Sequence, residues 1–226
     1  MLPIFRECEL GYSYSDDNVL VFFGKKAATV NALQHKFNDL QFYKLQQTHS
    51  DRLVEACKIA ENADAHWTTE KKCALLISTA DCLPIFILDN ITRTIIAIHA
   101  GWKGVSNQIV YKSLRVLITK KTSADQFTVW IGPHILTKSF EVHKDVLELL
   151  LSASYSNNKN DHYTAISDKF LVDLKSIVMS QIKAALGGGF QLNEICLNTK
   201  EDLNFNSYRR DKAESNRNLS FITLIK

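Results

Sequence analysis

Three apolar runs that follow one another between residues 74 and 98 restrict the fold more than any other feature of the chain. They are Ala74–Thr79, Pro84–Leu88 and Thr94–Ile98, and each is rich in aliphatic residues. Short runs of this kind, bounded by turn residues, are typical of strands. Because apolar residues follow one another instead of alternating with polar ones, we expect both faces of these strands to be covered. Similar runs predict further strands at Val19–Phe23, Phe127–Ile131, Glu194–Leu197 and Leu219–Ile225.

Helices are indicated where apolar residues recur at intervals of three and four. One such set is Val30, Leu33, Phe37 and Leu40, a second is Val110, Leu114 and Leu117, and the strongest is Leu171, Leu174, Val178, Ile182 and Ala185. Gly187 follows the strongest set and is typical of a helix end. The segment Leu151–His162, rich in Ser and Asn, is interpreted as a surface loop. Strands and helices are interspersed without strict alternation, which favours a layered α/β or α+β fold with a mixed sheet.

Length and composition exclude several classes of protein. A chain of 226 residues is expected to form a single domain spanning 1–226, and 46% hydrophobic with 23% charged residues is a globular composition. No apolar run is long enough to cross a membrane, and no targeting signal is apparent, so the expected location is the cytoplasm. A net charge of +3 is too small to indicate nucleic-acid binding. The oligomeric state is left unassigned.

The cysteines and the basic residues both bear on function. The five cysteines (8, 57, 73, 82 and 196) include no C-x-x-C pair, which argues for reduced thiols rather than a disulfide scaffold or a zinc ribbon. Near the C-terminus, basic residues cluster around two acidic ones. This cluster fits either a solvated loop or an anion site, and its members are Arg209, Arg210, Lys212 and Arg217.

Three residues beside strand ends or turns form a candidate metal site. Cys82 follows the strand that ends at Thr79, and His99 directly follows Ile98. A hairpin between the second and third apolar runs would place these two residues side by side. His49 would supply a third ligand from further upstream. Taken singly, a His or a Cys is more often a packed or surface residue.

One thiolate and two imidazoles suit zinc, and three protein ligands leave a fourth position open for catalysis. Gly101 and Gly104 would let the backbone approach a ligand closely, and Gly132 in Ile131-Gly132-Pro133 would line the same cleft. These residues fit simple strand ends equally well.

Taken together, these segments resemble the laccase-domain family, also called the YfiH-like or multicopper polyphenol oxidase family. The matching segments run in the family's order over roughly residues 45–226. They are Gln47-Thr48-His49, Ala63-Asp64-Ala65, Thr79-Ala80-Asp81-Cys82-Leu83-Pro84, His99-Ala100-Gly101-Trp102-Lys103-Gly104, Ile131-Gly132-Pro133, Phe140-Glu141-Val142, Asp173-Leu174 and Ser207-Tyr208-Arg209-Arg210.

The resemblance implies a three-layer α/β/α fold around a mixed β-sheet, with His49, Cys82 and His99 as zinc ligands. It also implies a purine nucleoside phosphorylase that converts adenosine, inosine, guanosine or methylthioadenosine and phosphate to free base and ribose 1-phosphate. Hydrolytic deamination of adenosine is the second implied activity. Cys82, His99 and Arg209 would then act in catalysis. Arg209 is the first choice for the phosphate contact and Arg210 the next, because a guanidinium matches phosphate bidentately.

Two regions depart from the family's pattern. The segment Gly11–Phe23 lacks the family's glycine-rich T-R-x-G-G-V-S type sequence, so the N-terminal segment is shortened or divergent and assigns no purine contacts. Near the C-terminus, the usual Gly-Arg becomes Asn216-Arg217. The preferred nucleoside is therefore left open.

Three other functions compete with this interpretation. Cys82 as nucleophile and His99 as base would make a Cys–His hydrolase, which includes editing of peptidoglycan precursors. A copper-dependent polyphenol oxidase is another alternative, although the chain has only seven histidines and multicopper catalysis needs more at its sites. The third is a non-enzymatic, partner-binding protein with a vestigial metal site. Asp81 is a possible proton carrier or equally a buried hydrogen-bonding residue.

Overall fold

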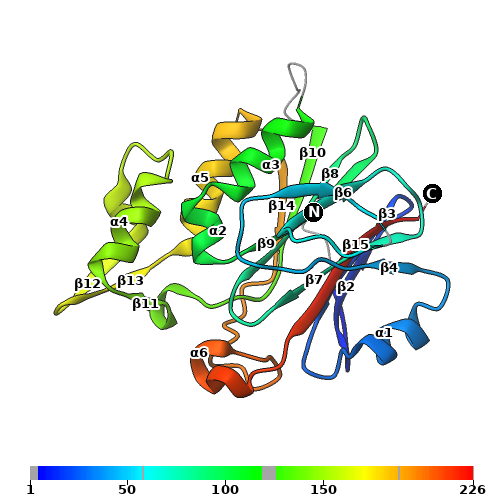
Figure 1. Ribbon diagram of the computed structural model, residues 1–226, viewed down its shortest axis with the longest axis horizontal. Helices are drawn as coiled ribbons and strands as arrows, with labels where there is room; N and C mark the ends of the chain where they lie inside the picture. Colours follow the sequence, from blue (N-terminus) through cyan, green and yellow to red (C-terminus); the bar gives the residue numbers. More distant parts are fainter. Residues whose placement is uncertain (1–4, 58, 119–125, 188, 226) are drawn as a thin grey trace.

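The protein is represented by a computed structural model that describes residues 5–57, 59–118, 126–187 and 189–225. These residues form two six-stranded mixed sheets and a small three-stranded sheet (Figure 1). The first sheet has the order β1 (Arg6–Cys8), β2 (Gly11–Ser15), β3 (Val19–Gly24), β15 (Asn218–Leu224), β7 (Cys73–Thr79) and β4 (Gln41–Tyr43). The second has the order β14 (Gln191–Glu194), β10 (Phe127–Ile131), β8 (Leu83–Asp89), β9 (Thr94–Ala100), β6 (Ala65–Thr68) and β5 (Leu53–Glu55). The third has the order β11 (Glu141–Val142), β13 (Lys169–Val172) and β12 (Tyr163–Ile166).

The two large sheets pack face to face, and helices cover their outer faces. Side chains between the sheets include Phe23 and Phe86, whose rings stack with centroids 5.2 Å apart. Apolar residues of α1 (Val30–Lys36) cover the first sheet, and those of α3 (Ile109–Leu117) and α5 (Leu174–Leu186) cover the second. Other helical segments of the described residues are α2 (Trp102–Ser106), η2 (Thr137–Ser139), α4 (Lys144–Ser152), η3 (Lys159–His162), α6 (Tyr208–Asp211) and η4 (Lys212–Glu214).

The expected mixed α/β class is confirmed, and the layer between the helices consists of two packed sheets rather than one. The three apolar runs form β7, β8 and β9, which are buried along almost their whole length. Their burial on both faces follows from their position, because one sheet or a helix layer covers each side. The described residues contain no helix that is both long enough and apolar enough to span a membrane.

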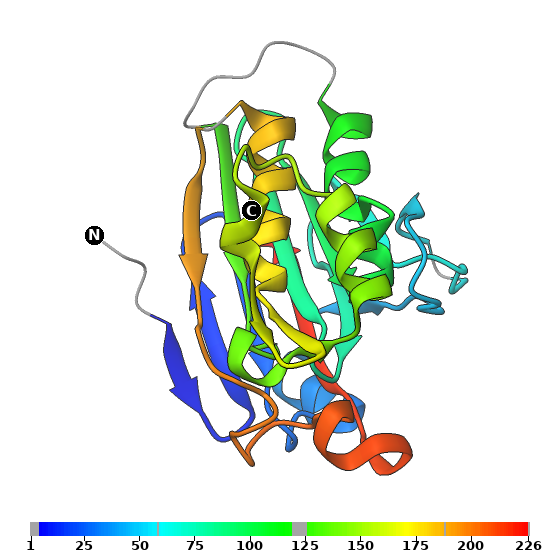
Figure 2. The same ribbon diagram turned by 90° about the vertical axis from the view of Figure 1, so that its left-hand side faces the viewer.

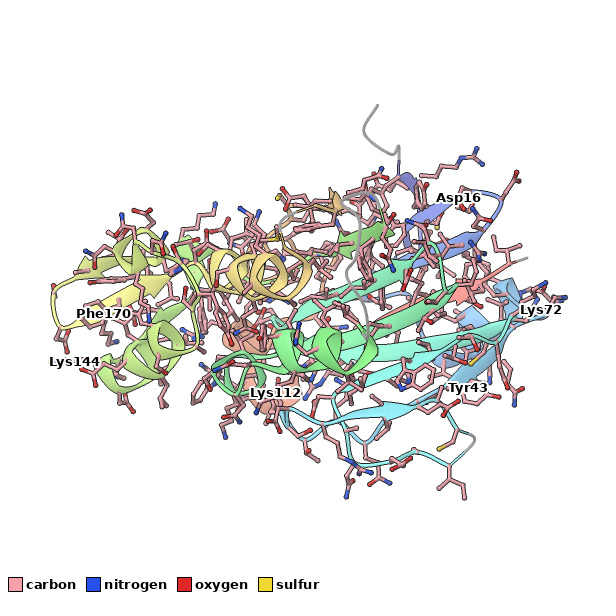
Figure 3. All side chains as sticks on the ribbon, turned by 90° about the horizontal axis from the view of Figure 1, so that it is seen from above. Asp16, Tyr43, Lys72, Lys112, Lys144 and Phe170 are labelled. Carbon is pink, nitrogen blue, oxygen red and sulfur yellow. The ribbon has the colours of Figure 1, made fainter. Side chains whose placement is uncertain are left out.

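The small sheet and α4 lie at one end of the long axis. Figure 3 places Lys144 of α4 and Phe170 of β13 at this end, with Tyr43 and Lys72 at the opposite end. The prediction of a surface loop over Leu151–His162 is wrong at both ends of the segment. Its first residues complete α4. His162 is buried, and the hydroxyls of Ser154 and Ser176 satisfy its ring nitrogens at 2.7 and 2.6 Å.

Two further element boundaries differ from the prediction. Leu171 belongs to β13, and α5 begins only at Leu174, because the Asp173 carboxylate caps the helix by accepting from the Ser176 N–H at 2.9 Å. The strand expected at Glu194–Leu197 is β14, Gln191–Glu194, whose parallel pairing with β10 ends at Ile131. Beyond Ile131 the pairing is reduced to an isolated parallel bridge between His134 and Asn198.

Candidate metal centre and cleft

The three predicted ligands meet at one end of the paired sheets. The ligand atoms of His49, Cys82 and His99 all lie within 4.8 Å of one another. The Cys82 Sγ lies 3.9 Å from the His49 Nε2, and the two imidazole ring centroids are 4.9 Å apart. Donors around a tetrahedral zinc ion lie about 3.3–3.6 Å apart, given its usual bond lengths. Closing the site on a metal ion would therefore take shifts of only a few tenths of an ångström to about one ångström.

The chain path explains why these residues meet. His49 lies on the link from β4 in the first sheet to β5 in the second, and Cys82 lies on the link from β7 to β8, which makes the same crossing. His99 is inside β9, opposite Pro84 of β8, so the antiparallel pairing places it beside the start of that strand. Both links contain strained backbone: the φ angles are 60° at His49 and 85° at Asp81.

Asp64 joins two of the ligands, and sequence reasoning assigned it no role. Its Oδ1 accepts from His99 Nδ1 at 2.8 Å, which leaves the His99 Nε2 lone pair for a metal ion. Its Oδ2 accepts from the backbone N–H groups of Thr48 and Ser50 at 3.1 and 2.6 Å, on either side of His49. One buried carboxylate thus orients both imidazoles. The sequence signal that could have identified this residue is an aspartate placed between two alanines at the start of a strand.

Gly101 is required by close packing at the same place. A Cβ at this position would lie 2.7 Å from the His49 Cδ2 and 3.0 Å from the Cys82 Sγ. The expected close approach of the Gly101 backbone is therefore an approach to two of the candidate ligands. At Gly104, a Cβ would lie 3.2 Å from the Ser50 carbonyl oxygen. Gly132 is constrained differently, since a Cβ there would overlap the Phe23 ring between the sheets.

Burial and neighbouring charges together set the pKa values of Cys82, His99 and Asp64. Burial alone would raise the pKa of Cys82, but His99 and His49 stabilise the thiolate and lower the pKa to about 6. Burial would lower the pKa of His99, but the Cys82 thiolate and the Asp64 carboxylate raise it to about 9. Burial would raise the pKa of Asp64, yet hydrogen bonds from His99 and Ser50 keep it below its usual range. The thiolate is thus formed at neutral pH, as metal ligation requires.

The three ligands lie in a cleft of about 670 Å³. Four cationic side chains also line it: Lys103, Arg209, Lys212 and Arg217. Within the described residues, none of the four forms an ion pair with a carboxylate. Among the described residues that line the cleft, Asp81 is the one acidic residue. The cleft therefore has a strong excess of positive charge, which favours an anionic ligand.

Asp81 connects Cys82 to α6. Its carboxylate oxygens accept from the Thr199 hydroxyl at 2.7 Å and from the Arg209 backbone N–H at 2.6 Å. The carboxylate is buried and each of its oxygens accepts a hydrogen bond, which favours the hydrogen-bonding interpretation over a proton carrier. The Arg209 guanidinium donates to the Glu141 carbonyl at 2.8 Å and lies over the Phe140 ring, 5.5 Å from its centroid. Most of its N–H donors are left for a ligand.

Arg210 is not placed as the sequence predicted. Its guanidinium donates to the Asp211 carboxylate and to the carbonyl oxygens of Thr199, Lys200 and Phe205, at 2.7–3.0 Å. It does not line the cleft. Its donors are occupied by the protein, so the structure does not support the expected contact between Arg210 and phosphate. Neighbouring residues of a helical turn point in different directions, and only one of the two arginines can face the cleft.

His134 also lies outside this cleft. It is buried, its Nδ1 is 2.8 Å from the Gly132 carbonyl oxygen, and it lines a second pocket with Lys175 and Cys196.

Comparisons with solved structures place the fold. The crystal structure of the Bacillus licheniformis hypothetical protein YfiH matches with a TM-score of 0.86 over 98% of this chain and 99% of its own, at 19% identity. The structure of YlmD from Geobacillus stearothermophilus matches with a TM-score of 0.85 over 99% of this chain and 100% of its own, also at 19% identity. At such identities the matches establish the fold alone.

Comparisons with sequences establish the family. A purine nucleoside phosphorylase of Clostridium acetobutylicum is 29% identical over 196 residues, which are 85% of this chain and 81% of that protein. A purine nucleoside phosphorylase of Bacteroides thetaiotaomicron is 34% identical over 172 residues, which are 75% of this chain and 63% of that protein. The family model described as multi-copper polyphenol oxidoreductase laccase matches residues 2–225. The chain therefore belongs to this laccase-like family, as the resemblance of its motifs predicted.

Proposed function

We propose that this chain is a zinc-dependent purine nucleoside phosphorylase that also deaminates adenosine. One observation carries the proposal: three metal-binding side chains and four cations without carboxylate partners line the same cleft. The names of the curated relatives support the substrate class. We place the reaction in the cytoplasm.

The donor set of His49, Cys82 and His99 fits zinc, and the Gly101 backbone leaves room for the ligands to close on it. When bound, the ion supplies a positive charge and Lewis acidity at one end of the cleft. We propose zinc over copper because multicopper chemistry needs many imidazoles, whereas only two histidines, His49 and His99, line this cleft among the described residues.

In phosphorolysis, phosphate attacks the ribose carbon as the bond to the purine breaks, and the sugar carries positive charge in the transition state. Arg209 is suited to hold the phosphate, because the Phe140 face and the Glu141 carbonyl fix its guanidinium and its other N–H donors have no partner among the described residues. Lys103, Lys212 and Arg217 add positive charge around the anion. Fixing phosphate in this way contributes mainly by positioning and by electrostatic stabilisation.

The test starts from purified protein with measured metal content, incubated with adenosine in the presence and absence of phosphate. Adenine and ribose 1-phosphate that form only with phosphate support phosphorolysis, and inosine without phosphate supports deamination. The variant Arg209→Gln should raise the phosphate KM by about 10- to 100-fold, as expected for loss of a charge-assisted bidentate contact. Arg52→Gln is the matched control, since Arg52 is exposed and pairs with Glu61 away from the cleft. Fully zinc-loaded protein that converts no purine nucleoside would refute the proposal.

A Cys–His hydrolase is the second candidate, and the alignment of Cys82, His99 and Asp64 favours it. The Cys82 thiolate would be the nucleophile, the His99 imidazole the base, and the Asp64 carboxylate the group that orients the imidazole. His49 separates the two candidates. The variant His49→Ala should abolish zinc binding and phosphorolysis, whereas a hydrolase that does not use metal would retain both activity and thiol alkylation.

A further inference from the structure

An aromatic side chain in the cleft contributes nothing to the core. Tyr208 lines the cleft and is 55% exposed. It belongs to none of the three apolar clusters, and no described residue accepts or donates a hydrogen bond at its hydroxyl or stacks on its ring. A half-exposed ring is ordinary on an open surface, but inside a ligand-sized cleft an unpartnered aromatic face is a surface that a planar ligand can cover.

The other exposed or cleft-lining aromatic rings differ from Tyr208. Tyr155 is 45% exposed, but its ring stacks on Tyr111 with centroids 4.8 Å apart. Phe140 lines the cleft but is buried beneath the Arg209 guanidinium. Trp102 packs against the core, and the Lys103 ammonium lies over its ring. Among the described cleft residues, Tyr208 therefore has the aromatic face with no protein partner.

The turn that carries Tyr208 is firmly held. Ser207 caps α6 by accepting from the Arg210 N–H at 3.2 Å, and the Arg210 guanidinium ties the turn to three carbonyl oxygens. Asp81 accepts from the next residue, Arg209, and so fixes the turn beside Cys82. In Figure 2, β14 and the segment after it descend to α6, which lies at the lower end of the sheets. These contacts fix the backbone from which the Tyr208 side chain projects before a ligand arrives.

We infer that the Tyr208 ring is the stacking surface for the purine base. The inference rests on the proposed function and deepens it. Arg209, the phosphate-holding residue, directly follows Tyr208 on the same rigid turn. One short helix thus presents a planar ring for the base and a guanidinium for the anion. Stacking recognises any purine by its π face, so this contact accepts adenine, hypoxanthine and guanine alike.

The test measures binding of adenine to the zinc-loaded protein by calorimetry, with no turnover involved. Tyr208→Phe should bind adenine like the wild type, and Tyr208→Ala should bind it roughly 5- to 150-fold more weakly, the range for loss of one stacking contact. In turnover, Tyr208→Ala should raise the nucleoside KM and leave the phosphate KM unchanged. Zinc content and thermal stability should be unaffected in both variants.

Tyr155→Ala is the matched control, because it removes an exposed tyrosine that lies outside the cleft. Adenine binding by Tyr208→Ala that equals the wild type, in a protein that cleaves adenosine, overturns the stacking role and leaves the proposed function intact. A wild-type protein that binds no purine base and cleaves no nucleoside overturns both. A rise in the phosphate KM equal to the rise in the nucleoside KM would show a general disturbance of the turn and would also overturn the specific role.

Discussion

Replacing Asp64 by Asn tests whether one carboxylate organises the metal centre. The change keeps the size and shape of the side chain and removes one acceptor oxygen. In the wild type, Oδ2 accepts from the Ser50 N–H at 2.6 Å, the Ser50 hydroxyl at 2.7 Å and the Thr48 N–H at 3.1 Å. Oδ1 pairs with the His99 Nδ1 at 2.8 Å. An amide offers a single oxygen, so it can serve only one of these two sides.

The two orientations of the amide differ in cost. If the amide nitrogen faces the His49 loop, two backbone N–H groups lose their acceptor, at about 1–3 kcal/mol each. If it faces His99, the imidazole must accept at Nδ1 and carry its proton on Nε2, the atom needed for the metal. We expect the second orientation, because a change of imidazole tautomer costs less free energy than leaving two backbone N–H groups without an acceptor. The fold then survives and the zinc site loses an available ligand.

The expected loss is about 10- to 100-fold in zinc affinity, the usual effect of removing a carboxylate behind a ligating histidine. This corresponds to about 1.4–2.7 kcal/mol. Zinc affinity is measured by competition with a chelating dye, and stability by denaturant unfolding. Asp89→Asn is the matched control: Asp89 is also buried and accepts from the backbone N–H groups of Ile91 and Thr92, outside the cleft. Wild-type zinc affinity in Asp64→Asn, or an equal loss in Asp89→Asn, would refute the reasoning.

Three further predictions follow from contacts and burial. Gly101→Ala should reduce zinc affinity by at least tenfold, measured with the same dye, because its Cβ would lie 2.7 Å from the His49 ring. In metal-free protein at pH 7.5, iodoacetamide should modify Cys82 long before Cys73, because the pKa of Cys82 is about 6 and burial raises the pKa of Cys73 to about 12. Peptide mapping with and without zinc measures the modification, and zinc should protect Cys82. Burial lowers the pKa of His66 to about 3, so below about pH 6.5 the unfolded chain binds a proton that the folded protein excludes. The free energy of unfolding should therefore fall by about 1.4 kcal/mol for each unit by which the pH is lowered. His66→Phe should remove this part of the pH dependence, measured by denaturant unfolding between pH 6.5 and 4.

The central strands were predictable because each is a continuous run of apolar residues, which indicates burial without reference to distant parts of the chain. The runs that form β7, β8 and β9 are apolar throughout, so the pattern needs no knowledge of distant residues. The edge strands are different. β1 is exposed or half-buried, and β4 and β5 are three residues each, too short to show a period. Their strand state depends on pairing with partners elsewhere in the chain, and tertiary contacts decide it.

The site was predictable where it depends on local pairing. Cys82 and His99 meet because β8 and β9 form the expected hairpin. The approach of His49 was suggested only by ligand chemistry and resemblance, since it depends on how the two sheets pack. The sequence interpretation put Arg209 first and Arg210 next as phosphate contacts, and in the structure Arg209 lines the cleft while Arg210 does not. Two adjacent arginines have the same side chain and the same charge. The orientation of α6, which the hydrogen bond to Asp81 fixes, decides which of them faces the cleft.

The position of the site at the crossings between the sheets links its affinity to their packing. The crossings from β4 to β5 and from β7 to β8 carry His49 and Cys82, and the return from β14 to β15 carries Tyr208 and Arg209. A metal ion held by the first two crossings would bind the folded chain far better than the unfolded one, where these ligands are far apart. Zinc at 100 times its Kd should therefore raise the free energy of unfolding by about 2.7 kcal/mol. Phosphate and nucleoside would add to this through the third crossing, so the catalytic ligands and the packing of the two sheets stabilise one another.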